Sequence, residues 1–112
     1  MLGALIPESI RQLFSKAATN MYPAVPFPTP EGFRGKLIAD NSICIGCKLC
    51  VRDCPAQAIE VVKTGEKQFK IVFYFDRCIY CGQCAESCNK NVIKITSDHE
   101  LAAYDRASLK SE

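Results

Sequence analysis

Eight cysteines carry the chemistry that this sequence can support, and they lie in two runs of identical spacing. In each run, two residues separate each of the first three cysteines from the next, and three more residues precede a fourth cysteine. The runs are Cys44, Cys47, Cys50 and Cys54, and then Cys78, Cys81, Cys84 and Cys88. Thiolates are strong ligands for zinc and iron and are the usual ligands of iron-sulfur clusters. The two equal runs therefore predict two metal centres.

The spacing favours [4Fe-4S] clusters, because each cluster needs four thiolates that approach it from different directions. Three closely spaced cysteines can surround one corner of a cluster, and the fourth must come from elsewhere. In proteins with two such clusters, the last cysteine of each run binds the other cluster. The sequence therefore predicts two crossed ligand sets, which are Cys44, Cys47, Cys50 and Cys88 for one cluster and Cys78, Cys81, Cys84 and Cys54 for the other. Because this exchange ties the two halves together, cluster binding and folding should be coupled.

Three other uses of the cysteines fit the pattern less well. A disulfide scaffold would require secretion, but the apolar residues 1–6 are too few for a signal peptide before Pro7, and disulfides give no reason to repeat one motif. Structural zinc usually takes cysteines two by two rather than as three plus one. A nucleophilic or redox-active dithiol is disfavoured because no histidine lies near either run and every Cys-x-x-Cys pair is already used.

The length of 112 residues predicts one domain with an arm or tail, and so small a core often needs a metal centre for stability. The net charge of +2 counts the thiols as neutral, so bound clusters would make the protein more acidic. A dense basic face with interleaved aromatic residues is also missing, which disfavours a nucleic-acid partner. No run is long enough for a transmembrane helix, and the reduced thiols suggest a cytoplasmic location.

The two halves form an internal repeat with an offset of 34 residues, from Cys44 to Cys78. Each half is expected to contain a strand, a cluster loop, a short helix and a second strand. We expect strands at 36–39, 58–63 and 68–75, the repeat of the second strand around Ile93 and Ile95, and helices around 50–53 and 84–87. Gly46 and Gly82 would let the backbone approach the clusters. The predicted fold is a small α+β domain over residues 36–97, a bacterial-type two-[4Fe-4S] ferredoxin-like domain with a pseudo-twofold repeat.

Residues 1–35 are predicted to form an amphipathic helix followed by an extended, proline-rich docking arm. Apolar residues recur at helical spacing over residues 8–20, and four prolines keep residues 21–35 out of helix and central strand. The helix could pack on its own domain, dock on a partner subunit or lie at a membrane surface, and its place outside the cysteine region favours docking. Residues 98–112 form a polar C-terminal tail, in which His99 is expected at the surface rather than as a metal ligand.

The sequence around the cysteines is more specific than the cysteines themselves. The segments are Tyr22-Pro23, Pro30-Glu31-Gly32-Phe33-Arg34-Gly35, Cys44-Ile45-Gly46-Cys47-Lys48-Leu49-Cys50, Asp76-Arg77-Cys78-Ile79-Tyr80-Cys81-Gly82 and His99-Glu100-Leu101-Ala102. They resemble the ferredoxin-like subunit of respiratory complex I and of its relatives, the energy-converting membrane-bound [NiFe] hydrogenases. The resemblance implies an electron-transfer subunit that accepts electrons from an input module or a soluble ferredoxin and passes them towards a catalytic centre on other subunits.

From the residues and the resemblance together we predict an electron relay through two [4Fe-4S] clusters, without a catalytic site on this chain. The sequence agrees, since it contains no glycine-rich phosphate loop and no candidate acid-base pair. The subunit would lie at the cytoplasmic face of the cell membrane as a peripheral protein, held there indirectly by its partner subunits. The alternative is a freely diffusing two-[4Fe-4S] ferredoxin, which would have no use for the first 35 residues.

Overall fold

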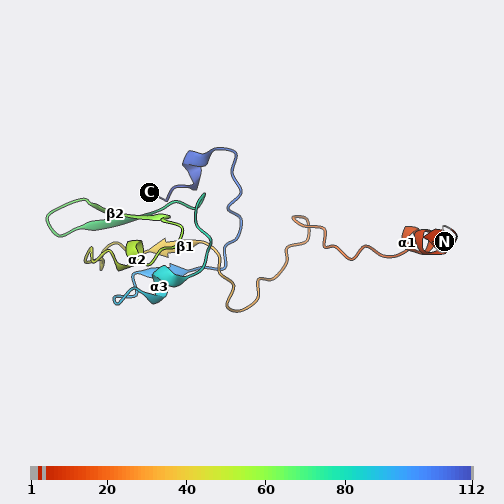
Figure 1. The fold of residues 1–112 in the computed structure, drawn as a ribbon, viewed down its shortest axis with the longest axis horizontal. Helices are drawn as coiled ribbons and strands as arrows, with labels where there is room; N and C mark the ends of the chain where they lie inside the picture. The colour runs from red at the N-terminus through yellow and green to blue at the C-terminus, as the bar shows by residue number, and fades with distance from the viewer. Residues whose placement is uncertain (1–2, 4, 112) are drawn as a thin grey trace.

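The computed structural model describes residue 3 and residues 5–111 as an elongated molecule of 74 × 30 × 29 Å. Its radius of gyration is 21.2 Å, whereas a compact chain of this length would have about 13 Å. The N-terminal region causes the difference (Figure 1): helix α1, Leu5–Leu13, lies at one end, and the strands lie at the other. Residues 14–36 connect them without helix or strand.

Helix α1 begins and ends earlier than the predicted range of 8–20, so the prediction that it continues to residue 20 is wrong. After Leu13 the turn tightens, because the N–H groups of Phe14 and Ser15 donate to carbonyls only three residues back, at 3.3 and 3.2 Å. The Ser15 hydroxyl also donates to the Gln12 carbonyl at 3.0 Å. In a longer helix this carbonyl would accept from a backbone N–H of the next turn. None of the side chains described in α1 is buried.

The second part of the molecule contains two small antiparallel sheets. Strand β1, Leu37–Ala39, pairs with β4, Ile93–Ile95, and strand β2, Ile59–Lys63, pairs with β3, Phe69–Phe73. Two one-turn helices follow the cysteine loops, α2 at Leu49–Arg52 and α3 at Gln83–Glu86. These elements lie within two residues of their predicted bounds, and the predicted small α+β class is confirmed.

The hydrophobic core lies between the two sheets and the two short helices. Phe73 of β3 is only 2% exposed, and the rings of Phe73 and Phe75 stack with their centroids 6.0 Å apart. Helices α2 and α3 each contribute one buried cysteine, Cys50 and Cys84. The buried cluster consists of Leu37, Cys50, Ile59, Ile71, Phe73, Phe75, Cys84, Val92 and Ile93. Two of the cysteines are thus part of the core that the strands build.

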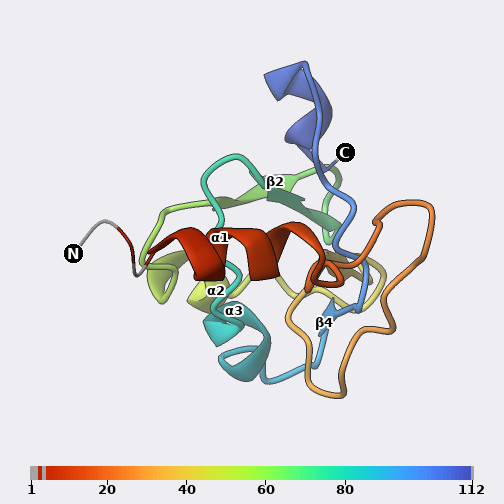
Figure 2. The ribbon, with the colours of Figure 1, turned by 90° about the vertical axis from the view of Figure 1, so that its right-hand side faces the viewer.

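The C-terminal segment turns back to the second sheet, as the view along the long axis shows (Figure 2). A short 3-10 helix, η2 at Arg106–Leu109, begins where the Asp105 side chain accepts a hydrogen bond from the Ala107 N–H. Beyond it, the Ser111 N–H donates to the Phe73 carbonyl at 2.9 Å and the Ser111 hydroxyl accepts from the Phe73 N–H at 2.8 Å. The end of the described chain therefore covers part of the outer edge of β3. Among residues 3 and 5–111, no helix is long and apolar enough to cross a membrane.

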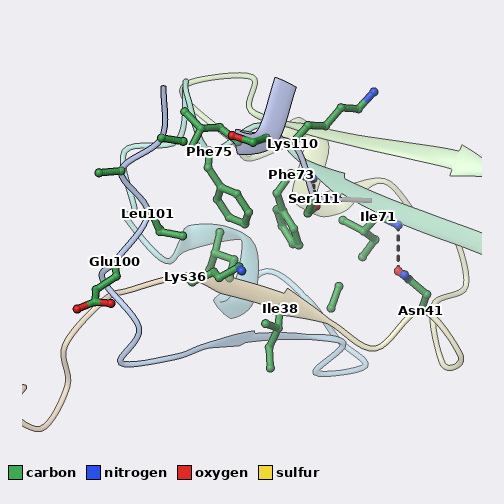
Figure 3. A pocket seen from close by; sticks show the side chains of 16 residues that line it. Lys36, Ile38, Asn41, Ile71, Phe73, Phe75, Glu100, Leu101, Lys110 and Ser111 are labelled. Carbon is green, nitrogen blue, oxygen red and sulfur yellow. Dashed lines mark hydrogen bonds between the residues drawn. The ribbon is translucent and has the colours of Figure 1, made fainter. Parts of the chain in front are cut away.

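A groove of about 560 Å³ lies between β1, the outer edge of β3 and the C-terminal segment (Figure 3). Ile71 and Phe73 contribute apolar side chains, and Lys36, Glu100 and Lys110 contribute charged ones. No cysteine lines this groove. The metal-binding chemistry predicted from the sequence must therefore be sought on other parts of the domain.

Candidate iron-sulfur centre

The first three cysteines of the first run meet the last cysteine of the second run around one cavity. Cys44, Cys47 and Cys50 come from the loop before α2 and from α2 itself, and Cys88 comes from the turn after α3. The remaining wall is largely apolar and includes Ile45, Leu49, Val61, Ile71 and Val92. The structure thus brings together the four residues that the sequence placed in one ligand set.

Electrostatic effects show the same grouping. Burial raises the pKa of Cys50 to about 11, and the further causes that raise it are the charges of Cys47, Cys44 and Cys88. A thiol with so high a pKa needs a strong positive partner to lose its proton, and iron in a cluster is such a partner. The donor set and its burial therefore fit a metal cluster.

The three leading cysteines of the second run form a matching group around α3. Burial raises the pKa of Cys84 to about 11, and the charges of Cys78, Cys81 and the first-run Cys50 raise it further. The pKa of Cys78 is also raised, first by burial and then by the charges of Cys54 and Cys81. Cys54 of the first run therefore lies near Cys78, the first cysteine of the second run.

Backbone N–H groups point at three of the cysteine sulfurs. The N–H of Ala58 donates to Cys54 Sγ at 3.3 Å, and the N–H of Val92 donates to Cys88 Sγ at 3.4 Å. Each of these donors lies four residues after its cysteine, one position before the start of β2 or β4. A third bond joins the Tyr80 N–H to Cys78 Sγ at 3.4 Å. Such bonds stabilise thiolates, and they are one means by which a protein tunes a cluster potential.

Left-handed backbone turns shape both cysteine loops. Lys48 and Gly82 precede α2 and α3 with φ values of 59° and 81°. Gly46 has φ +69°, and a Cβ on it would lie 2.5 Å from the ring of Phe69. A glycine at position 46 is therefore required both by the backbone conformation and by the ring that packs over it.

A single zinc ion is the alternative to a cluster as the group that the cysteines bind. Among residues 3 and 5–111, no three His, Cys, Asp or Glu side chains are grouped closely enough to hold a single metal ion. In a [4Fe-4S] cluster each iron takes its own thiolate, so the four sulfurs can lie farther apart than around one ion. Eight cysteines in two runs of four match the number of thiolate ligands that two [4Fe-4S] clusters take.

Two contacts at the site were not predicted from the sequence. The Arg34 guanidinium donates from Nη1 to the Cys81 carbonyl at 2.7 Å, although 47 positions separate the two residues. The ring of His99, which is exposed as predicted, lies between Tyr22 and Phe33 with centroid distances of 6.0 and 5.8 Å. The only signal in the sequence was the occurrence of these residues in the segments that carry the family resemblance.

Comparison with known proteins supports the interpretation of the cysteines. A family model described as a 4Fe-4S dicluster domain matches residues 43–100. NADH-quinone oxidoreductase subunit I 2 of Geobacter metallireducens is 37% identical over 109 residues, which cover 88% of this chain and 82% of the relative. Formate hydrogenlyase subunit 6 of Escherichia coli is 38% identical over 92 residues, which cover 80% of this chain and 50% of that subunit.

A solved structure of a membrane-bound sulfane sulfur reductase, an archaeal respiratory membrane complex, contains a similar chain with a TM-score of 0.69 and 25% identity. The match covers 89% of this chain and 55% of the other. The chain likewise spans 48% of NAD(P)H-quinone oxidoreductase subunit I of Gloeobacter violaceus, at 34% identity. It thus spans about half the length of several relatives. The resemblance predicted from the sequence is confirmed: the chain is a 4Fe-4S dicluster protein with two [4Fe-4S] clusters as its cofactors, and it belongs to the family of NADH-quinone oxidoreductase subunit I.

Proposed function

We propose that this chain is an electron-transfer subunit of a membrane-bound, multi-subunit oxidoreductase of the hydrogenase and complex I family. The observation that carries the proposal is the cavity at which Cys44, Cys47 and Cys50 of one half meet Cys88 of the other. Each bound [4Fe-4S] cluster accepts and passes on one electron at a time. The chain itself supplies thiolates, an apolar wall and N–H donors to sulfur, which hold the clusters and limit their contact with water.

The ligand sets follow the crossed scheme. Cys88 completes the set of Cys44, Cys47 and Cys50, and Cys54 completes the set of Cys78, Cys81 and Cys84. The two halves are related by a pseudo-twofold repeat over residues 36–97. In support, the bounds of α2 and α3 differ by the same 34 residues as the two cysteine runs, since Leu49 corresponds to Gln83 and Arg52 to Glu86.

Residues 1–35 are the docking region, an amphipathic helix with a proline-rich arm. Its apolar side chains have high exposed fractions, 78% for Leu13 and 83% for Phe14 in and after α1, and 58% and 59% for Val25 and Phe27 in the arm. Side chains of this kind are stabilised when they are buried, and α1 lies at the opposite end of the molecule from the cysteine domain (Figure 1). They therefore suit the surface of another subunit.

The partners are the other subunits of the complex, including the one that carries the next cluster on the catalytic side. The relatives support this, since they belong to quinone oxidoreductases, a formate hydrogenlyase and a membrane-bound respiratory complex. A soluble ferredoxin or an electron-input module is the donor. We place the subunit at the cytoplasmic face of the cell membrane as a peripheral protein, attached through its partners.

Purification from gently solubilised membranes tests this function. A tagged chain should bring down a large catalytic subunit and membrane subunits, and the complex should contain eight iron atoms for the two clusters of this chain in addition to those of other subunits. Nickel in the complex would indicate a hydrogenase, and the same assembly without nickel would indicate a quinone- or sulfur-reducing relative. Recovery of the chain alone as a brown protein in the soluble fraction would instead support a freely diffusing ferredoxin.

A further inference from the structure

Arg34 is the last arginine before the cysteine domain, and it lies against the loop of the second run. Its Nη1 donates to the Cys81 carbonyl at 2.7 Å, and its Nε lies 3.9 Å from the point where a Cβ on Gly82 would be. The guanidinium therefore covers the peptide bond that follows one of the proposed ligands and precedes helix α3. No other side chain of the arm has a described hydrogen bond to a cysteine loop.

The backbone next to Arg34 is held in place. The Gly35 N–H donates to the Thr96 carbonyl at 2.9 Å, and the Lys36 N–H donates to the Asp98 carbonyl at 2.8 Å. Gly35 is buried, and a Cβ on it would lie 2.7 Å from the Thr96 oxygen and even closer to the Asp98 oxygen. Because the chain can come this close only at a glycine, the Arg34 side chain starts from a fixed position.

The charge of Arg34 has no carboxylate partner in the described part of the chain. Among residues 3 and 5–111, the salt bridges join Arg11 to Glu8, Arg52 to Asp53 and Arg106 to Asp76. The two surface pockets that Arg34 lines contain one carboxylate, that of Glu31, which forms no salt bridge with Arg34, and neutral residues such as Tyr80 and Thr96. A full positive charge is thus hydrogen-bonded to the loop that holds Cys81. Arg34 is itself exposed, so solvent weakens but does not abolish its effect.

We propose that Arg34 is a positioning residue that fixes the Cys81 loop and raises the reduction potential of the cluster bound by Cys78, Cys81, Cys84 and Cys54. The inference rests on the proposed function. One electron from the donor adds one negative charge to this cluster, and the same electron leaves for the next carrier. A nearby guanidinium stabilises the reduced form over the oxidised form, which makes reduction more favourable. The first cysteine run has no equivalent contact from Arg34.

An anaerobic redox titration followed by electron paramagnetic resonance tests the proposal on the intact complex. In Arg34→Gln, the cluster of the second run should become harder to reduce by about three- to tenfold in its one-electron equilibrium, where tenfold corresponds to about 59 mV. The potential of the first-run cluster should not change. The signal of the second-run cluster is identified as the one that Cys78→Ala removes.

Two further variants separate charge from geometry. Arg34→Lys keeps the charge and a donor, so it should retain most of the potential that Arg34→Gln loses. Lys67→Gln makes the same charge change in the exposed turn between β2 and β3, outside the docking region and both cysteine loops, and should leave both potentials unchanged. If Arg34→Gln instead loses the second-run signal altogether while the first remains, and Arg34→Lys restores it, the positioning role is supported.

Three results would overturn the inference. These are an unchanged second-run potential in Arg34→Gln, an equal shift of both clusters, and a shift of the same size in Lys67→Gln. A wild-type complex without two cluster signals assigned to this chain would overturn the proposed function itself. The failure of the inference and the failure of the proposed function therefore give different results.

Discussion

Replacement of Gly46 by alanine should destabilise the loop of the first cysteine run through two separate physical effects. Gly46 has φ +69°, which a residue with a Cβ adopts at a cost of about 1–2 kcal/mol. The new methyl group would also lie 2.5 Å from the Phe69 ring, so the ring or the loop must move. Crowding of this kind typically costs about 1–3 kcal/mol. The free energy of unfolding should therefore fall by about 2–5 kcal/mol.

Gly65 offers a matched control, because a Cβ there would meet its nearest atom, Gln68 Cβ, at an ordinary 3.6 Å. Gly65→Ala should change the free energy of unfolding by less than about 1 kcal/mol. Making Gly46→Ala in a protein that already carries Phe69→Leu separates the two effects of the alanine. There the crowding is relieved, and the cost of Gly46→Ala should fall to about 1–2 kcal/mol.

Anaerobic denaturant unfolding of the cluster-loaded protein, followed by the loss of visible absorption, measures these differences. In Gly46→Ala, the first-run cluster should be released before the second, because Gly46 lines the cavity of Cys44, Cys47, Cys50 and Cys88. The reasoning would be refuted if Gly46→Ala were no more destabilising than Gly65→Ala. It would also be refuted if the loss were the same in the Phe69→Leu background, since the ring would then play no part.

Three further predictions follow from the site and the fold. Cys54→Ala should reduce the occupancy of the second-run cluster more than that of the first, measured by iron content and paramagnetic resonance, and selective loss of the first-run cluster would contradict the crossed ligand sets. Deletion of residues 1–30 should leave both clusters bound but release the subunit from the membrane complex, as judged by co-purification; a truncated chain that stays attached would show that the arm is not the anchor. Phe73→Ala, at a side chain 2% exposed, should cost about 3–5 kcal/mol of unfolding free energy, whereas Tyr104→Ala at the surface should cost less than about 0.5 kcal/mol.

The cysteine domain could be predicted from the sequence because its signals are local and are repeated. Each cysteine run fixes a loop and a one-turn helix, and the runs 58–63 and 68–75, which are rich in β-branched and aromatic residues, indicate two strands. The structure places β2, β3, α2 and α3 within two residues of those ranges. The grouping of Cys88 with the first run could also be predicted, because a cluster needs a fourth thiolate from outside the run.

The contacts that join distant, polar segments could not be predicted. Tyr22 donates to Glu100, and Ser111 bonds to Phe73 on β3, but neither segment has an apolar period that would indicate its neighbour. The end of α1 at Leu13 was missed for another reason. Apolar residues continue at helical spacing through Ala18, whereas the hydroxyl of Ser15 donates a hydrogen bond to the carbonyl of Gln12 where the helix ends.

The meeting of Cys88 with Cys44, Cys47 and Cys50 has a consequence for the biosynthesis of the protein. A ribosome makes the chain from the N-terminus, so the first three cysteines emerge long before the residue that completes their set. In the proposed crossed scheme, the second set is equally dependent on Cys54, which is made early, before Cys78, Cys81 and Cys84. Neither cofactor can therefore be fully enclosed on a nascent chain that has not reached Cys84. The machinery that delivers iron and sulfide must act on a nearly finished polypeptide, or it must shield the exposed thiols of the first run until synthesis is complete.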